Sequence, residues 1–312
     1  MRKFLIRRLM FMFISAIGAT AIVFLLSRMA GDPTLVFLES SGYGVSEEQV
    51  ENLRKKLGVD KPLVVQYGLW LSRLAQGDMG RTLIGEKKVA TVIREKFGAT
   101  LQLAIAGWLF ATVVGVPLGV LSAVKRGSIW DYVARGIALF GQATPAFWIA
   151  IIGVLIFAVT LGWLPSGLKG EGFSPKHFVL PMITVGWGAA AGYLRLTRSA
   201  MLEVLDSEYI RFARAKGVNM RVVIWKHAFR NALLQPLTAS ILLFAGLLNG
   251  QIVAESIFAW PGIGRVALLQ GVWDNDFPLL TGAVLVFIMI YLIMALFADI
   301  LYGVIDPRIR YD

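Results

Sequence analysis

The chain has 312 residues, of which 57% are hydrophobic and 16% are charged, with a mean hydropathy of +0.68. A water-soluble domain of this size does not carry so much apolar surface, so the composition indicates an integral membrane protein. The formal net charge of +11 could suggest nucleic acid, but the basic residues lie in short segments beside apolar runs, which is typical of membrane topology and predicts no nucleic-acid partner.

Apolar runs of the length that a bilayer core requires, roughly 20 residues, recur along the chain. The predicted transmembrane spans are residues 9–27, 99–124, 136–164, 178–194, 232–254 and 278–304. The fourth is short and rich in Gly and Pro. The first follows a basic N-terminus, yet its apolar run exceeds that of a signal peptide and no A-x-A site follows, so we interpret it as an uncleaved anchor. The sequence therefore predicts an all-α membrane protein with six transmembrane helices.

These spans divide the chain into four regions. Residues 1–28 hold the N-terminus and the first span, and residues 29–98 form a segment outside the membrane. In that segment Ser46 begins one helical pattern, which ends before Gly58, and a second pattern covers residues 63–74. Residues 99–304 hold the other five spans and the polar loop 195–231, and residues 305–312 form a C-terminal tail.

The distribution of Lys and Arg in the short loops predicts the orientation, because cytoplasmic loops carry the excess. One side receives Arg2, Lys3, Arg7, Arg8, Lys125, Arg126, Arg195, Arg198, Arg211, Arg214, Lys216, Arg221, Lys226, Arg230, Arg308 and Arg310. The short loops of the other side hold Lys169, Lys176 and Arg265. Both termini are therefore expected in the cytoplasm and segment 29–98 outside, in the cytoplasmic membrane of a bacterium or archaeon.

The spans carry few groups that could do chemistry. Ionisable residues lie only near span ends, at Arg28, Arg135 and Asp299, whereas ion-driven carriers need intramembrane ion sites. His177 and His227 fall at opposite membrane faces and cannot ligate a haem or a metal together. The chain has no cysteine and no G-x-x-x-x-G-K-[ST] phosphate loop. We therefore expect no enzyme activity and no bound cofactor, with any energy supplied by another subunit.

Glycine and proline are abundant in the spans and admit two interpretations. Small residues let helices pack closely in lipid, or they bend helices that line a route for solute. The motifs in question are Gly115-Val-Pro-Leu-Gly119, Gly141-Gln-Ala-Thr-Pro145 and Gly186-Trp-Gly188 with Gly192. Polar or helix-bending residues at span depth make candidate pathway residues of Gln142, Thr144, Pro145, Asn249 and Gln251.

The stretch 206–217, DSEYIRFARAKG, lies between two apolar runs and predicts a short helix of about ten residues. Asp206 or Ser207 can cap its start, and Gly217 can adopt the left-handed conformation that ends it. At 100° per residue one stripe carries Glu208, Arg211 and Arg214. The opposite face carries Tyr209, Ile210, Phe212 and Ala213, with Lys216 at its border. Such a helix is too short to be stable alone, so it must pack against something.

Three interpretations of this helix remain open from physical chemistry. It can lie on the inner leaflet with its basic face on anionic lipid, or its charges can only set the topology. Alternatively, its small residues Ala213 and Ala215 permit close approach by a groove of a cytoplasmic protein.

The same stretch resembles the EAA loop of the permeases of ATP-binding-cassette importers, in the form used by the dipeptide, oligopeptide and nickel transporter family. That motif reads E-Y-[IV]-R-x-A-R-A-K-G and is followed by H-A-x-R-N-A-L. It is matched here by Glu208, Tyr209, Ile210, Arg211, Ala213, Arg214, Ala215, Lys216 and Gly217, and then by His227, Ala228, Arg230, Asn231, Ala232 and Leu233.

The resemblance extends over nearly the whole chain. Further matching motifs are Arg7-Arg8-Leu9, Gly31-Asp32-Pro33, Leu53-Arg54 with Leu57-Gly58, Gly77-Asp78-Met79-Gly80, Ala123 to Ser128, Ala259 to Arg265, and Asp306-Pro307-Arg308. The long segment after the first span is similar to that of the first, B-type, permease of the pair. Two departures, Gln235 before Pro236 and Ala30 before Gly31, affect local geometry and not the motif.

This resemblance implies a type I importer permease that forms half of a pore and works by alternating access. Its implied partners are a second homologous permease, two ATP-binding subunits that bind ATP and Mg, and an extracytoplasmic solute-binding protein. The helix would then be a coupling helix in a groove of an ATP-binding subunit, with Ala213, Ala215 and Gly217 permitting close contact. Glu208, Tyr209, Arg211, Arg214 and Lys216 complete the predicted coupling site.

Two other classes compete with this interpretation. One is a membrane subunit of a redox or enzyme complex, which the lack of His pairs and intramembrane acids disfavours; the other is a stand-alone secondary carrier, which the charge-poor spans disfavour. Family frequency favours peptides as the cargo, and it leaves nickel, glycosides and other small solutes open.

Overall fold

The computed structural model describes residues 2–29, 48, 51–52, 54–55, 60–170, 174–249 and 251–305. In this part of the chain the regular structure is helical, apart from one isolated antiparallel bridge between Arg81 and Lys88. The helix predicted to begin at Ser46, the Gly31-Asp32-Pro33 motif and the C-terminal Asp306-Pro307-Arg308 motif fall largely or wholly outside the described residues.

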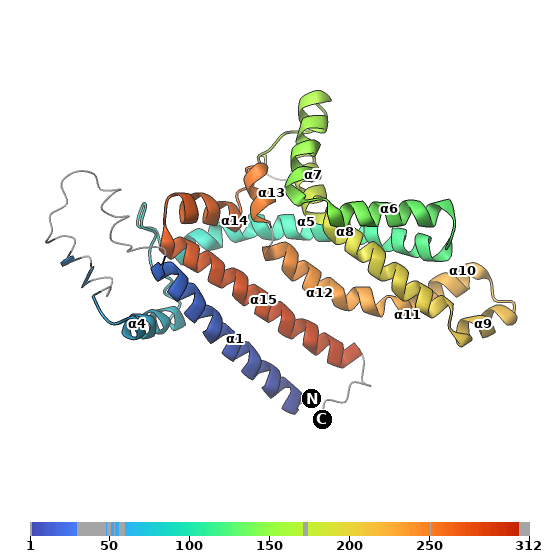
Figure 1. Ribbon diagram of the computed structural model, residues 1–312, viewed down its shortest axis with the longest axis horizontal. Coiled ribbons are helices and arrows are strands. Elements are labelled where there is room, and N and C mark those ends of the chain that lie inside the picture. The colour runs from blue at the N-terminus through green and yellow to red at the C-terminus, as the bar shows by residue number, and fades with distance from the viewer. Residues whose placement is uncertain are drawn as a thin grey trace. The chain divides into compact units, whose positions relative to one another are not determined.

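Among the described residues five helical stretches are long and apolar enough to cross a membrane, and the number is six if a bent helix pair counts as one span (Figure 1). This confirms the predicted all-α membrane fold. Four of the candidate spans lie on α1 (Arg2–Met29), α5 (Val89–Val124), α8 (Pro175–Leu205) and α15 (Phe277–Ile305), and the fifth covers Leu234–Ile257, which includes α12 (Leu234–Asn249). Several of these helices extend past the ends of the predicted spans, because polar residues outside the apolar core of the membrane can continue a helix.

The residues of the third predicted span, 136–164, lie largely on a bent helix pair and not on one straight helix, and this pair is either one broken span or a re-entrant loop. Helix α6 (Ile129–Ala143) and helix α7 (Ala146–Gly153) meet at an angle of 104°, and a π-helix, η1 (Val154–Thr160), continues α7. The bend falls at Thr144 and Pro145. The proline ring disfavours helical geometry at the residue before it, and Thr144 is accordingly extended.

The shorter elements fill the connections. The helix predicted over residues 63–74 is confirmed as α4 (Leu63–Ala75). The polar loop contains α9, α10, η2 and α11, and the stretch between α12 and α15 contains α13, α14 and η3. Their bounds are Glu208–Ala215, Met220–Val222, Val223–Phe229, Arg230–Ala232, Ile252–Ile257, Ile263–Val266 and Ala267–Trp273.

The chain forms two compact units. One holds Thr100–Trp260 together with the end of α15 from Ile293, and the other holds Arg2–Ala99 and Pro261–Leu292. The polar loop and α9 belong to the first unit, and the predicted outer segment belongs to the second.

Helices α5 and α8 pack closely in the first unit because glycines line their contact. A Cβ atom added to Gly119 would lie 2.7 Å from the carbonyl oxygen of Leu194, and one on Gly186 would lie 2.5 Å from that of Gly107. A Cβ on Gly115 would collide with the carbonyl oxygen of Ala190. At Gly141 on α6 the obstacle is the Ala191 side chain, at 2.7 Å. Close packing therefore explains these glycines, whereas Gly192 faces open space.

The second unit holds its own apolar cluster and one buried carboxylate. Val89 and Ile93 of α5 pack with Leu279 and Ala283 of α15. Just before α15, Asp276 accepts hydrogen bonds from the backbone N–H groups of Leu279 at 3.1 Å and Leu83 at 2.9 Å. Burial raises the pKa of Asp276 above its ordinary value, and these N–H donors oppose that rise. The carboxylate thereby ties the hairpin around Leu83 to the start of the last span.

Candidate functional site

Helix α9 covers Glu208–Ala215, inside the predicted stretch, and its two ends are formed in different ways. Gly217 has φ +74°, and its N–H donates to the carbonyl of Arg214, so the predicted left-handed stop is confirmed. The predicted side-chain cap at the start was wrong. Ser207 occupies the N-cap position, but its hydroxyl donates to the carbonyl of Val204, and Asp206 ends α8 and pairs with Arg126 at 3.3 Å.

The two faces of α9 differ sharply in exposure. Ile210 is fully buried and Ala213 is half-buried, and both point into the chain's own core. Tyr209 and Phe212, which the sequence places on the same apolar face, are 44% and 65% exposed. The apolar face is therefore divided, with an inner part that seats the helix and an outer part that has no cover in the described chain.

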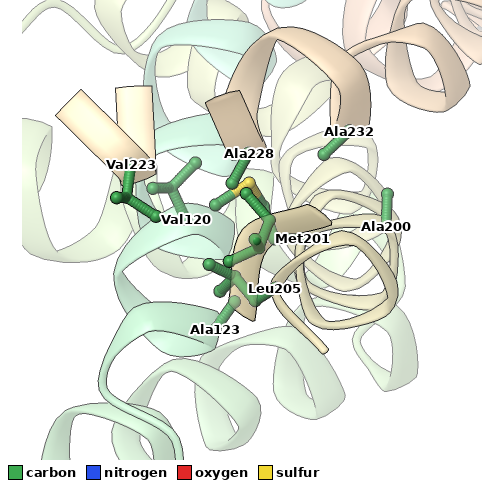
Figure 2. Close-up of a cluster of buried hydrophobic side chains, with 9 residues drawn as sticks. Val120, Ala123, Ala200, Met201, Leu205, Val223, Ala228 and Ala232 are labelled. Atoms are coloured by element: carbon green, nitrogen blue, oxygen red, sulfur yellow. The ribbon is translucent and has the colours of Figure 1, made fainter. Parts of the chain in front are cut away.

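Helix α9 packs on a buried apolar cluster, which we call its seat and to which five elements contribute side chains. Its buried members are Val120, Ala123, Ala200, Met201, Leu205, Ile210, Val223, Ala228 and Ala232. Figure 2 shows Met201 in the middle, with Val120, Leu205 and Ala228 around it. Because the cluster joins α5, α8, α9, η2 and α11, a displacement of α9 is resisted by side chains of two transmembrane helices.

Hydrogen bonds and charges fix α9 further. The Tyr209 hydroxyl donates to the carbonyl oxygen of His227 at 3.0 Å and accepts from the Asn231 amide at 2.9 Å. On the outer surface Arg211 pairs with Glu208 at 2.9 Å, and the Lys216 ammonium lies 5.0 Å from the centre of the Phe212 ring. Arg214, Ala215 and Gly217 are also exposed. The predicted coupling residues are thus brought together on one short helix, and all except Ala213 lie on its exposed surface.

A buried ion pair close to α9 was missed by the sequence analysis, which treated Arg198 as a topology signal only. Asp131 of α6, with a side chain 2% exposed, receives the Arg198 Nε at 2.8 Å and Nη2 at 3.1 Å. The Ser122 hydroxyl of α5 donates to the same carboxylate at 2.6 Å, and the Gly127 N–H donates at 3.0 Å. The sequence signal for this ion pair was Asp131 itself, a single acidic residue close to the basic end of a predicted span.

This network joins the ends of three transmembrane helices at the place where α8 leads into α9. The bidentate geometry fixes the direction of Arg198 as well as its distance, which an isolated Lys–Asp contact would not. It therefore holds α5, α6 and α8 in one arrangement beside the seat of α9.

Three of the predicted pathway residues lie at the break between α6 and α7. Gln142 and Pro145 are exposed, and the Thr144 hydroxyl donates to the carbonyl of Phe140 at 2.6 Å. The Thr144 hydroxyl thus adds to the backbone N–H bond that Thr144 makes with the same carbonyl. An exposed side-chain amide, that of Gln142, lies beside this sharp bend.

The other two pathway residues lie where α12 gives way to α13. Both polar atoms of the Gln251 side chain are buried without a hydrogen-bond partner among the described residues, and so is the Asn249 side-chain oxygen. Gln251 is only 2% exposed. A small cavity lined by Val114, Leu118, Ile137 and Trp187 contains none of these predicted pathway residues.

Among the described residues no group of three or more His, Asp or Glu side chains could hold a metal ion. The His177 ring nitrogen Nδ1 lies 2.7 Å from the Ser174 hydroxyl, next to the start of α8. His227 contributes its backbone carbonyl to the bonds that hold Tyr209. Each histidine thus has a local structural role.

Comparison with known proteins gives matches along the whole chain. The model of a family described as binding-protein-dependent transport system inner membrane component matches residues 115–311, and the model of an N-terminal part with a corresponding description matches residues 1–104. The dipeptide transport system permease protein DppB of Alkalihalophilus pseudofirmus is 37% identical over 337 residues, covering 100% of both chains. DppB of Escherichia coli K12 is 37% identical over 342 residues, covering 100% of this chain and 99% of that protein.

A protein of Brucella abortus named for a peptide transport system permease is 39% identical over 297 residues, which is 92% of each chain. Solved structures share the fold at lower identity. A chain of the inward-facing MetNI methionine ABC transporter superposes with a TM-score of 0.58 at 19% identity, covering 69% of this chain and 96% of that chain. A chain of an amino acid ABC transporter gives a TM-score of 0.50 at 18% identity, with 70% and 94% covered.

Proposed function

Because this chain belongs to the family of binding-protein-dependent transport system inner membrane components, we propose that α9 is the element through which ATP-binding subunits drive its pore. The chain is a transmembrane permease subunit of an ATP-binding-cassette importer, and such subunits leave ATP hydrolysis to their partners. The family implies no resident cofactor, and ATP and Mg would be bound by the ATP-binding subunits. The remaining questions are where force enters this chain, what passes through it and what assembles with it.

The observation that carries the coupling proposal is the division of α9 into a buried and an exposed face. Ile210 is fully buried in a cluster shared with α5 and α8, whereas Phe212 is 65% exposed. A helix whose charges only set the membrane topology would need neither a buried apolar face nor an exposed one. The outer face presents Tyr209, Phe212 and the small Ala215, which suit insertion of a short helix into a protein groove.

The charges of α9 fit the same role. Glu208 lies in the first turn and Arg214 in the last, so both complement the helix dipole and remain exposed for a partner. Arg211 is held toward Glu208 and can instead meet an acid on a partner surface, since an exposed pair of this kind is worth at most about 1 kcal/mol.

Motion would be transmitted because α9 cannot move without its seat. A groove that closes on the outer face displaces Ile210, and through Met201 and Leu205 it displaces the end of α8. The Asp131–Arg198 pair then carries α6 and α5 along with α8. The displaced helices line half of the pore, and alternating access follows from their movement as a packed group.

The proposed cargo is di- and oligopeptides, because relatives that match the full length are named for dipeptide transport. The bend at Thr144 and Pro145 and the polar side chain of Gln142 are the proposed contacts along the path. Uncharged groups of this kind suit a conduit that accepts varied peptides and leaves selection to a binding protein.

The proposed assembly contains this chain, a second homologous permease, two ATP-binding subunits and an extracytoplasmic solute-binding protein. Both termini and α9 lie in the cytoplasm, in agreement with the Lys and Arg excess on that side. The membrane is the cytoplasmic membrane of a bacterium or archaeon.

Reconstitution tests the proposal. The chain is placed in proteoliposomes with its second permease and ATP-binding subunits, and uptake of a radiolabelled dipeptide is measured with and without the solute-binding protein and ATP. We expect uptake only when both are present. Uptake by this chain alone, driven by an ion gradient, would instead establish a secondary carrier.

A further inference from the structure

Helix α4, Leu63–Ala75, is too short to span a bilayer and too apolar for water. Its sequence, LVVQYGLWLSRLA, has thirteen residues and one charged side chain, Arg73. A transmembrane helix needs roughly 20 apolar residues. A water-exposed helix shows a broad polar face, whereas the exposed polar side chains of α4 are Ser72 and Arg73, near its C-terminal end.

The inner face of α4 is fixed to the first transmembrane helix below the end of that helix. The Tyr67 hydroxyl lies 3.0 Å from the Thr20 hydroxyl and donates to the carbonyl of Ile17 at 3.3 Å. Because α1 ends at Met29 and a helix rises about 1.5 Å per residue, Thr20 lies roughly 13 Å below that end. Tyr67 therefore reaches well into the depth of the membrane that α1 crosses.

Contacts between aromatic rings also place α4 beside α1 below its Met29 end, independently of these hydrogen bonds. The Phe24 ring, 3% exposed, lies 5.4 Å from the Tyr67 ring and 5.6 Å from the Trp70 ring. Phe24 also precedes the end of α1 by more than one turn. Two successive turns of α4 thus pack against α1 below its end, and Figure 1 shows the two helices side by side.

The outer face of α4 is apolar and has no cover from the described chain. Val64 is 82% exposed, Val65 is 45% exposed and Leu69 is 38% exposed. On the side of α1 that faces away from α4, Ile22 and Leu26 are each 59% exposed. Both helices therefore present apolar side chains outward.

From this placement we propose that α4 lies in the leaflet around the Met29 end of α1, with Val64, Val65 and Leu69 against lipid acyl chains. The Tyr67 hydroxyl is satisfied by α1 at this depth, and the Arg73 side chain can extend toward lipid phosphate. The chain thus carries a short helix embedded in the leaflet, within the segment that the sequence places outside the membrane. This inference is independent of the coupling role of α9.

We favour lipid over a second protein as the partner of the outer face of α4, because the neighbouring helix α1 also exposes apolar side chains around its surface. Only 11% of the most apolar window of α1 is buried in the chain. A protein interface would be expected to cover one side of α1 and leave polar residues on the other, whereas the apolar residues of α1 surround the helix.

The absence of cysteine in the sequence allows a direct test with single-cysteine variants. Val64→Cys carries a nitroxide label on the outer face of α4, and Lys87→Cys carries it on the exposed hairpin that precedes α5. Leu69→Cys serves as a second position if Val64→Cys inserts poorly. The full chain is reconstituted in phosphatidylcholine–phosphatidylglycerol vesicles, alone and in the assembled transporter, and collisions with oxygen and with a water-soluble nickel chelate are measured.

We expect the label at Val64 to be accessible to oxygen and shielded from nickel in both preparations, with the opposite at Lys87. Access of nickel to Val64 and Leu69 would place α4 in water and overturn the proposal. Shielding from both reagents only in the assembled transporter would show that a protein covers this face, and it would equally overturn the lipid assignment.

Discussion

At the scale of single residues, glycine and one buried acid determine how the transmembrane helices fit. Gly119 and Gly186 lie where a second helix backbone approaches, so a methyl group has no room there. Asp131 is buried with a bidentate arginine, a hydroxyl and a backbone N–H, so its charge is fully compensated. These residues fix distances between helices, which apolar side chains alone do not specify.

Gly119→Ala should destabilise the protein, since the added Cβ would lie 2.7 Å from both the Leu194 carbonyl oxygen and the Thr197 Cβ. Overpacking of this kind costs roughly 1–3 kcal/mol. Thermal unfolding in detergent should show the loss. Gly136→Ala is the matched control, because nothing lies within 4 Å of its added Cβ, and it should be neutral or slightly stabilising. Equal effects of the two substitutions would contradict the packing role.

Asp131→Asn should cost roughly 3 kcal/mol, because it leaves the half-buried Arg198 guanidinium without its counter-charge. The control is Arg126→Ala, which breaks the exposed pair with Asp206 and should cost less than about 1 kcal/mol. The free energy of unfolding of both variants is compared in the same detergent. A loss no greater than that of the control would show that the network does not hold the three helices.

At the scale of elements, the sequence predicted where helices occur better than how they end or bend. Hydrophobic runs located every span, and Gly217 located the end of α9, because a left-handed turn demands that residue type. The bend at Thr144 was not assigned, since Pro145 inside an apolar run is compatible with a kinked span or with a broken one. The angle depends on what α7 packs against, which no local pattern records.

The same limit applied to the coupling site. The repeating charges of α9 predicted the polar stripe correctly, but periodicity placed Tyr209, Ile210 and Phe212 on one apolar face, of which only Ile210 is buried. Which apolar side chains of α9 are buried depends on how η2 and α8 pack beside it, and the local sequence does not record that packing. The Asp131–Arg198 pair joins residues far apart in the chain, so the lone acid Asp131 could mark the site in the sequence but could not identify its partner.

Ile210→Ala should loosen α9 from its seat without removing any outer contact. Truncation of a fully buried Ile costs roughly 2–5 kcal/mol, and the loss should appear locally as faster hydrogen exchange of the α9 amides. Phe212→Ala is the counterpart on the exposed face, and it should leave exchange unchanged while weakening association with the ATP-binding subunits. If Phe212→Ala accelerates exchange as much as Ile210→Ala does, the two faces do not have separate roles.

At the scale of the whole molecule, the chain is a permease subunit of an ATP-binding-cassette importer, and we propose that a push on one short helix moves several of its spans. Composition excludes a soluble protein, and the described residues provide neither a nucleotide site of the phosphate-loop type nor a metal site. Permease subunits of this family leave ATP hydrolysis to their partners, so we expect energy to arrive through contact with another subunit. The one seated and partly exposed helix of the polar loop is where we infer that this contact occurs.

The measurement that tests this claim most directly is ATP hydrolysis by the reconstituted transporter carrying Ala215→Glu, stimulated by its peptide-loaded binding protein. Ala215 is exposed and outside the buried cluster, so the variant should insert and fold normally, while the larger charged side chain blocks close approach to the ATP-binding subunit. Ala215→Ser, which stays small, should retain stimulation. We predict that Ala215→Glu loses assembly or stimulated hydrolysis, whereas normal stimulation in the assembled Ala215→Glu complex would contradict the coupling role of α9.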